Sequence, residues 1–208
     1  MSPTSIKVLI ADDHPVVRLG LKTMIDYESD LELVGEASNG EEAIKLFRQY
    51  QPDVALIDLR MPIIDGVEAI SVIIHEFPKA QIIILTTYDG DEDIYRGLQA
   101  GAKSYLLKNT LYEELLATIK KVNEGHSYIP NVVGVKLAER INYSQLSPRE
   151  IDVINLMAKG KSNRDIGDSL SIAEGTVKYH VNNILSKLQV NDRTQAVITA
   201  FQRGIASL

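Results

Sequence analysis

Short apolar runs alternate with amphipathic stretches along the chain from Lys7 to about Glu124. The runs are rich in β-branched residues and read KVLIA, LELVGEA, DVALID, QIIILTT and SYLL. The stretches between them carry apolar residues at helical spacing, and Asn39 followed by Glu42 is typical of a capping box at a helix start. Alternating strands and helices predict βα units around a parallel sheet. We therefore expect a doubly wound α/β domain with five strands and helices on both faces.

The pattern changes beyond Glu124. Residues 125–143 contain glycine and proline and lose the strong helical period, which indicates a linker, partly helical from Val135 to Ile141. After the linker the chain shows only helical signals. In LSPRE, Ser147 is suited to cap a helix that has Pro148 at its first position and Glu150 at its third. The second region therefore predicts a separate, small all-helical domain.

Composition narrows the class of protein. The 208 residues are 45% hydrophobic and 24% charged, and no apolar stretch approaches the roughly 18 residues of a membrane span. We expect a soluble, unexported protein without a membrane partner. The absence of cysteine excludes disulfides, thiolate metal sites and cysteine nucleophiles, which suits a cytoplasmic location.

Charge is distributed unevenly between the two regions. Residues 1–128 hold 21 acidic and 12 basic side chains, a net charge of −9, whereas residues 129–208 hold 7 and 10, a net charge of +3. We therefore expect any polyanionic partner to bind the second region.

Acidic residues follow two of the predicted strands. Asp12 and Asp13 come directly after the first, and Asp58 comes after the third. If these strands are neighbours, the three carboxylates converge, and their mutual repulsion favours a bound cation. Carboxylate oxygens suit a hard ion such as Mg²⁺. The alternative is that each acid is a helix cap, as Asp13 would be for a helix opening at His14, or a solvated turn residue.

Two further strand ends add a hydroxyl and an amine. Thr86 follows the fourth strand and Lys108 the fifth. Three acids, a hydroxyl and a lysine at one edge of a sheet are typical of a site where an aspartate accepts a phosphoryl group with the help of Mg²⁺.

The motifs IADDHP, LIDLRMPIIDG, ILTTYD and SYLLKN resemble, in this order, the receiver domain of bacterial two-component response regulators. The resemblance implies a flavodoxin-like fold and phosphorylation of Asp58 by a sensor histidine kinase. It also implies that Mg²⁺ binds Asp12, Asp13, Asp58 and the backbone carbonyl of Arg60, that Lys108 contacts the phosphoryl group, and that Thr86 and Tyr105 form the switch.

The segment from LSPREIDVINLMAKGKSNRDIG to KLQVNDRTQAVI resembles a LuxR-type helix-turn-helix domain, and with the receiver it gives the NarL/FixJ family. The resemblance implies a receiver over 1–124, a linker over 125–143 and a four-helix DNA-binding domain over 144–208. Ser162 would begin the first helix of the motif, and the recognition helix would run from about Glu174 to Leu188.

One face of this recognition helix is polar. Its hydrogen-bonding side chains are suited to the DNA major groove, although an ordinary solvated helix face explains them equally well. The candidates for DNA contact are Thr176, Lys178, Tyr179, Asn182 and Asn183. Two departures from the family are expected to lower stability: Ala173 replaces a hydroxyl N-cap, and Gly167 lies inside the preceding helix where alanine is common.

These features predict a DNA-binding transcription regulator. Phosphorylated Asp58 would shift the receiver towards an active state, which permits dimerisation and binding to two half-sites about one helical turn apart. Val197, Ile198 and Phe201 could form the dimer seam, although core packing explains them equally well. The family also implies RNA polymerase as a partner, and a receiver that covers the recognition helix before phosphorylation.

Two other classes of function share some of these features. Enzymes of the haloacid dehalogenase type also phosphorylate an aspartate, but they need an acid two residues later, where this chain has Arg60. We therefore predict no metabolic enzyme; hydrolysis of its own phosphoaspartate is compatible with this prediction. A helix-turn-helix that binds protein would differ from one that binds DNA in being insensitive to salt.

Overall fold

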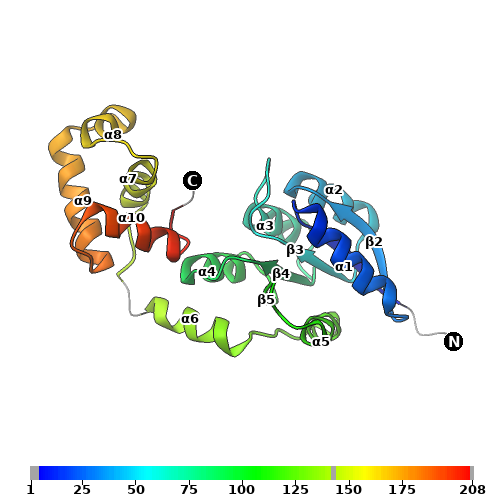
Figure 1. Ribbon diagram of the computed structural model, residues 1–208. Coiled ribbons are helices and arrows are strands. Elements are labelled where there is room, and N and C mark those ends of the chain that lie inside the picture. Colours follow the sequence, from blue (N-terminus) through cyan, green and yellow to red (C-terminus); the bar gives the residue numbers. More distant parts are fainter. Residues whose placement is uncertain (1–4, 142–143, 207–208) are drawn as a thin grey trace. The chain divides into compact units, whose positions relative to one another are not determined.

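The computed structural model describes residues 5–141 and 144–206 (Figure 1). Its contacts divide the chain into two units. The first comprises Met1–Tyr88 with Ile94–Gly134, and the second comprises Asp89–Asp93 with Val135–Leu208. Each unit is a compact body of its own.

The first unit alternates strands and helices. Its strands are β1 (Ile6–Ala11), β2 (Leu31–Ala37), β3 (Val54–Ile57), β4 (Ile82–Thr86) and β5 (Ser104–Leu107). Its helices are α1 (Pro15–Tyr27), α2 (Gly40–Tyr50), α3 (Gly66–Glu76), most of α4 (Asp91–Gln99) and α5 (Tyr112–Asn123).

The five strands form one parallel sheet in the order β2-β1-β3-β4-β5. The expected fold class is therefore confirmed, and β1 and β3 are neighbours. Beyond β5, the backbone N–H of Tyr128 donates to the carbonyl of Lys103 at 3.0 Å, and Tyr128 forms a parallel bridge with Ser104.

Helices cover both faces of this sheet because the apolar side chains of each strand alternate between them. Val8 and Ile10 lie in a buried cluster with Leu21 of α1 and Ile119 of α5. On the other face, Leu9 approaches α2, and the rings of Phe47 and Phe77 lie 5.3 Å apart where α2 meets the end of α3. The layers place the carboxyl ends of all five strands at one edge.

The second unit is helical over its described residues. It contains α6 (Asn131–Ile141), which begins at the end of the first unit, and then α7 (Pro148–Ala158), α8 (Asn163–Leu170), α9 (Glu174–Leu188) and α10 (Arg193–Gln202). Buried apolar residues from α7, α8, α9 and α10 share one core. The helix expected from Val135 to Ile141 is present and begins earlier, at Asn131.

The helix starts mostly follow their sequence signals. Ser147 and Glu150 form the expected capping box on α7, and Ser162 forms a second box with Asp165 on α8. At α2 the expected box is only half formed. The Asn39 side chain accepts the Glu42 N–H at 2.9 Å, but the Glu42 carboxylate binds the Ser38 N–H and hydroxyl.

None of the helices in the described ranges is both long enough and apolar enough to cross a lipid bilayer.

Candidate metal centre and nucleic-acid interface

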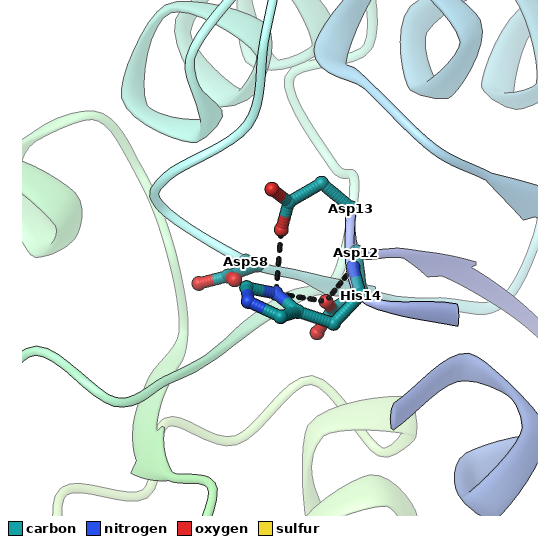
Figure 2. Close-up of side chains that lie close together, drawn as sticks. All are labelled: Asp12, Asp13, His14 and Asp58. Atoms are coloured by element: carbon teal, nitrogen blue, oxygen red, sulfur yellow. Dashed lines mark hydrogen bonds and ion pairs between the residues drawn. The ribbon is translucent and has the colours of Figure 1, made fainter. Parts of the chain in front are cut away.

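Three carboxylates meet where β1 and β3 end. Ala11 pairs with Ile57 in the sheet, so the next residues, Asp12 and Asp58, leave the strands side by side. Both are nearly enclosed, with Asp12 2% and Asp58 3% exposed. Figure 2 shows Asp13 above them and His14 beside them, and one ligand atom from each of the four side chains lies within 4.8 Å of the others.

The backbone holds two of these acids in fixed orientations. Asp12 Oδ1 accepts the backbone N–H of His14 at 2.9 Å, and Asp58 Oδ1 accepts the N–H of Leu59 at 2.7 Å. Gly66 begins α3 directly against this segment, where an added Cβ would lie 2.0 Å from the carbonyl oxygen of Asp58. A side chain at Gly66 would therefore displace the backbone that carries Asp58.

The helix-cap explanation of Asp13 is wrong. Helix α1 begins at Pro15, its N-cap is His14, and no side chain caps it. Since Pro15 lacks an N–H, there is less for a cap to bind at this end. Asp13 Oδ1 is instead buried and accepts no hydrogen bond from the residues that the structure describes.

Lys108 supplies a cation to the two enclosed acids. Leu107 pairs with Thr86 in the sheet, and the Lys108 that follows extends its Nζ to 2.6 Å from Asp12 Oδ2 and 2.6 Å from Asp58 Oδ2. Burial alone lowers the pKa of Lys108, but its hydrogen bonds to Asp12 and Asp58 outweigh burial and raise the pKa above the usual lysine value. The ammonium therefore stays charged and offsets part of the repulsion between the acids.

The remaining donors fit a divalent cation. Asp13 Oδ1 lies beside two carboxylates and 2.7 Å from His14 Nδ1, it accepts no hydrogen bond among the described residues, and carboxylate oxygens are the donors that Mg²⁺ prefers. The guanidinium of Arg60 lies over the Tyr88 ring, 5.0 Å from its centroid. Arg60 would therefore serve such an ion through its backbone carbonyl, as the resemblance implies.

The two expected switch residues are both fully buried, and both contact Tyr88. Thr86 Oγ1 accepts the Tyr88 N–H at 3.4 Å, and the Tyr105 hydroxyl donates to the Tyr88 carbonyl at 2.7 Å. The sequence motifs did not single out Tyr88. Tyr88 lies two residues after the end of β4, and this position was the signal in the sequence that could have indicated its contact with the site.

Helix α9 presents the expected polar face. Val177, Ile184 and Leu188 are buried in the core of the second unit. The opposite face is open, and Tyr179 is 63% exposed. Thr176, Lys178 and Asn182 are exposed as well, and Asn183 is half-buried. Lys178 Nζ lies 2.9 Å from Glu174 Oε1, an exposed pair one helical turn apart.

The three candidate seam residues on α10 differ in their surroundings. Val197 and Phe201 are half-buried and pack against the core of the second unit. Ile198 is 51% exposed. Core packing therefore accounts for the first two, and Ile198 is the member that presents an apolar side chain to solvent.

Comparison with known proteins matches both halves of the chain. The family described as response regulator receiver domain matches residues 8–120, and the family described as bacterial regulatory proteins, luxR family, matches residues 144–200. The response regulator protein VraR of Staphylococcus aureus is 42% identical over 206 residues, covering 97% of this chain and 99% of VraR.

Solved structures of response regulators are similar to this chain over nearly its whole length. The response regulator ChrA of a heme-sensing two-component system is 36% identical, with a TM-score of 0.60 over 97% of this chain and 98% of ChrA. RcsB of Salmonella enterica serovar Typhimurium, bound to promoter P1flhDC in the presence of the phosphomimetic BeF3-, is 25% identical. Its TM-score is 0.72 over 94% of this chain and 98% of RcsB.

Proposed function

Because the chain belongs to the DNA-binding response regulators that join a receiver domain to a LuxR-type helix-turn-helix, we propose that phosphorylation of Asp58 controls its binding to DNA. The observation that carries this proposal is the enclosed position of Asp58 at the end of β3, where the Lys108 ammonium bridges it to Asp12. The phosphoryl donor is a sensor histidine kinase, and the regulator acts in the cytoplasm, where its DNA lies.

Asp58 is suited to be the nucleophile. One of its carboxylate oxygens attacks the phosphorus of a phosphohistidine, the new O–P bond replaces the P–N bond, and the kinase imidazole leaves. Lys108, which binds Asp58 Oδ2 at 2.6 Å, remains beside the product and pairs with the added negative charge. Asp12, Asp13, Asp58 and the Arg60 carbonyl would hold Mg²⁺, which supplies charge neutralisation at the phosphoryl oxygens.

The signal leaves this site through Tyr88. A phosphoryl group adds acceptor oxygens to which the Thr86 hydroxyl can donate, and rotation of the side chain towards them would break its contact with the Tyr88 N–H, which is already long at 3.4 Å. Tyr105 binds the carbonyl of the same Tyr88, so displacement of that residue also breaks the Tyr105 hydrogen bond. The two arrangements form an equilibrium that phosphorylation shifts.

At the other end of the chain, α9 reads the DNA. Its exposed residues Thr176, Lys178, Tyr179 and Asn182, together with the half-buried Asn183, meet base edges and phosphates in the major groove. Lys178 exchanges Glu174 for DNA at little cost because exposed ion pairs contribute little. Phosphorylated copies dimerise and place two α9 helices in half-sites about one helical turn apart, where RNA polymerase can be contacted.

The test is phosphorylation of the full chain with acetyl phosphate and Mg²⁺, with Asp58→Asn as the matched variant. Sedimentation and fluorescence anisotropy on a duplex selected from a random pool would report dimerisation and affinity. We expect phosphorylation to produce dimer and tighter, salt-sensitive DNA binding only where Asp58 is present. Equal binding by Asp58→Asn under both conditions would exclude the switch. Sustained Mg²⁺-dependent turnover of small phosphate esters would instead point to an enzyme.

The DNA face is tested separately. Lys178→Ala is expected to weaken binding at least tenfold and to reduce the dependence of affinity on salt. Lys159→Ala, an exposed lysine after α7, is the control and should change affinity little. Equal losses in the two variants would place the DNA elsewhere on the second unit.

A further inference from the structure

Arg193 is the first residue of α10, and its guanidinium reaches the residues that open α8. Its Nη1 donates to Asn163 Oδ1 at 3.2 Å, and its Nη2 donates to the carbonyl oxygen of Lys161 at 2.5 Å. Both acceptors are neutral. These two hydrogen bonds therefore fix the orientation of the guanidinium without balancing its positive charge.

No acid in the described part of the chain balances that charge. Arg193 forms no ion pair there, and the nearest acids along the sequence serve their own helices. Asp192 accepts the Gln195 N–H at 2.9 Å, and Asp165 accepts the Ser162 N–H at 3.1 Å. Arg193 is half-buried, and burial lowers its pKa without a neighbouring charge that raises it again. A cation partly removed from water without a counter-ion carries a cost that an external anion would offset.

Arg149 shows the different surroundings of an arginine whose charge is balanced inside the same unit. Its Nη2 donates to the carbonyl oxygen of Leu170 at 2.7 Å, much as Arg193 donates to Lys161. Its Nη1, however, also lies 3.5 Å from Asp152 Oδ2. Two arginines of the second unit thus bind backbone carbonyls in the same way, and Arg193 is the one that lacks an acid.

The surroundings of Arg193 are suited to a phosphate. A guanidinium has five N–H donors, and the two neutral acceptors occupy only two of them. Lys161 and Arg164 lie beside the start of α8, are exposed, and form no ion pair with the described residues. In helix-turn-helix proteins the first helix of the motif crosses the DNA backbone while the second enters the major groove. Since α8 is that first helix here, Arg193 contacts the part of the unit that approaches the backbone.

We propose that Arg193 binds a phosphate of the DNA backbone through its remaining N–H groups, while Asn163 and the Lys161 carbonyl hold the guanidinium in place. A planar guanidinium can pair with a phosphate through two parallel hydrogen bonds. Such a contact fixes the register of α9 on the duplex and carries no sequence information. This inference rests on the proposed binding of DNA by the second unit and adds a binding residue outside α9.

The first test measures how DNA affinity depends on salt, by fluorescence anisotropy of the full chain on a mixed-sequence duplex, with and without acetyl phosphate. Each phosphate contact contributes about 0.9 to the slope of log affinity against log salt concentration. We expect Arg193→Gln to bind about tenfold more weakly and to lose about one unit of this slope. Arg193→Lys keeps the charge and should keep most of the slope. Arg149→Gln is the matched control and should keep the wild-type slope.

A second measurement does not depend on whether Arg193→Gln folds. In nitrogen NMR spectra of the wild type, the guanidinium resonance that is absent from Arg193→Lys should shift when the duplex is added and return at high salt. An unchanged slope in Arg193→Gln, an equal loss of slope in Arg149→Gln, or a guanidinium resonance that ignores DNA would each overturn the proposal.

Failure of the proposed function would look different. If acetyl phosphate leaves DNA affinity unchanged while the slope still depends on Arg193, the phosphorylation switch is wrong and the phosphate contact stands. If phosphorylation tightens binding and the slope ignores Arg193, the reverse holds.

Discussion

The ammonium of Lys108 lies 2.6 Å from a carboxylate oxygen of Asp58, and both side chains are largely enclosed. The same ammonium binds Asp12, so one lysine holds two acids that would otherwise repel each other. The charge balance at the end of the sheet therefore depends on a single side chain when no metal is bound.

Replacement of Lys108 exposes that dependence. Lys108→Ala leaves two buried carboxylates without their cation, and we expect it to lower the free energy of unfolding of the metal-free protein by about 2–3 kcal/mol. Added Mg²⁺ should then raise the thermal midpoint more than it does in the wild type. Lys120→Ala removes an exposed pair with Asp30 and serves as the control, with little change expected. An identical Mg²⁺ response in wild type and Lys108→Ala would contradict the prediction.

Ile63 is held in a strained backbone conformation in the loop after Asp58. Its φ is 72°, a region that β-branched residues rarely occupy, and its side chain is 74% exposed. Relief of strain of about 1–3 kcal/mol exceeds the entropic cost of glycine, so Ile63→Gly should stabilise the chain by about 1 kcal/mol. Urea unfolding of both proteins measures this gain in the free energy of unfolding. Leu19→Gly, at an exposed residue inside α1, should destabilise the chain, and a gain there would remove the basis of the argument.

Glu150 links stability to pH in the second unit. It is 3% exposed and lies 2.6 Å from Lys187 Nζ. Burial raises the pKa of Glu150, but hydrogen bonds from Lys187 and from the Ser147 N–H outweigh burial and hold the pKa below its usual value. A depressed carboxyl pKa stabilises the fold above the unfolded value of about 4.3, and this stability is lost as the pH falls through the folded pKa.

Glu150→Gln should therefore cost about 2–3 kcal/mol at neutral pH, because it breaks the buried pair with Lys187, whereas the amide oxygen of glutamine can still accept the Ser147 N–H in the α7 capping box. The difference from the wild type should narrow as the pH falls below about 4.3. Calorimetry of the full chain between neutral and acidic pH measures both the loss of stability and its decrease at low pH. Glu139→Gln, at an exposed residue of α6, is the control. A difference that stays constant with pH would mean that the charge of Glu150 is unimportant.

Gly167 is expected to resist replacement. Helix propensity alone predicts that Gly167→Ala gains about 1 kcal/mol. In the structure, an added Cβ would lie 2.7 Å from the carbonyl oxygen of Ile172, a backbone atom that cannot simply turn aside. We expect Gly167→Ala to lower the thermal midpoint. Gly134→Ala in α6, where nothing lies within 4 Å, should raise it, and equal effects at both glycines would show that the close approach is unimportant.

Ala173 leaves the start of α9 without a side-chain cap. Its backbone already has the extended N-cap conformation, with φ −64° and ψ 145°, but it offers no acceptor. Ala173→Ser should therefore raise the free energy of unfolding by about 1 kcal/mol, as thermal unfolding would report. Ala173→Val lacks an acceptor and should give no gain. A gain from both would assign the effect to something other than capping.

The sequence predicted the sheet, the helices and the meeting of Asp12 with Asp58, because alternating apolar runs and strand-end acids are local signals. It did not predict the contacts of His14. This side chain approaches the carboxylates of Asp12 and Asp13 through the turn between β1 and α1, and the conformation of that turn has no signal in hydrophobic periodicity.

Tertiary contacts explain the other differences. Gly167 looked like a cost because propensity ignores Ile172, which folds back against it. The positive φ of Ile63 has no sequence signal, since isoleucine ordinarily avoids that region. Both differences come from the backbone: the carbonyl oxygen of Ile172 in the first case and the φ angle of Ile63 in the second. Composition and hydrophobic periodicity do not describe backbone geometry.

The bridge between Ser104 and Tyr128 bears on association between chains. β5 is the last strand of the sheet and has only four residues, so it offers few free backbone groups on its outer side. Tyr128 already occupies part of that side, with its N–H on the Lys103 carbonyl. A strand from another molecule would find little to pair with, and this end of the sheet is therefore a poor template for aggregation.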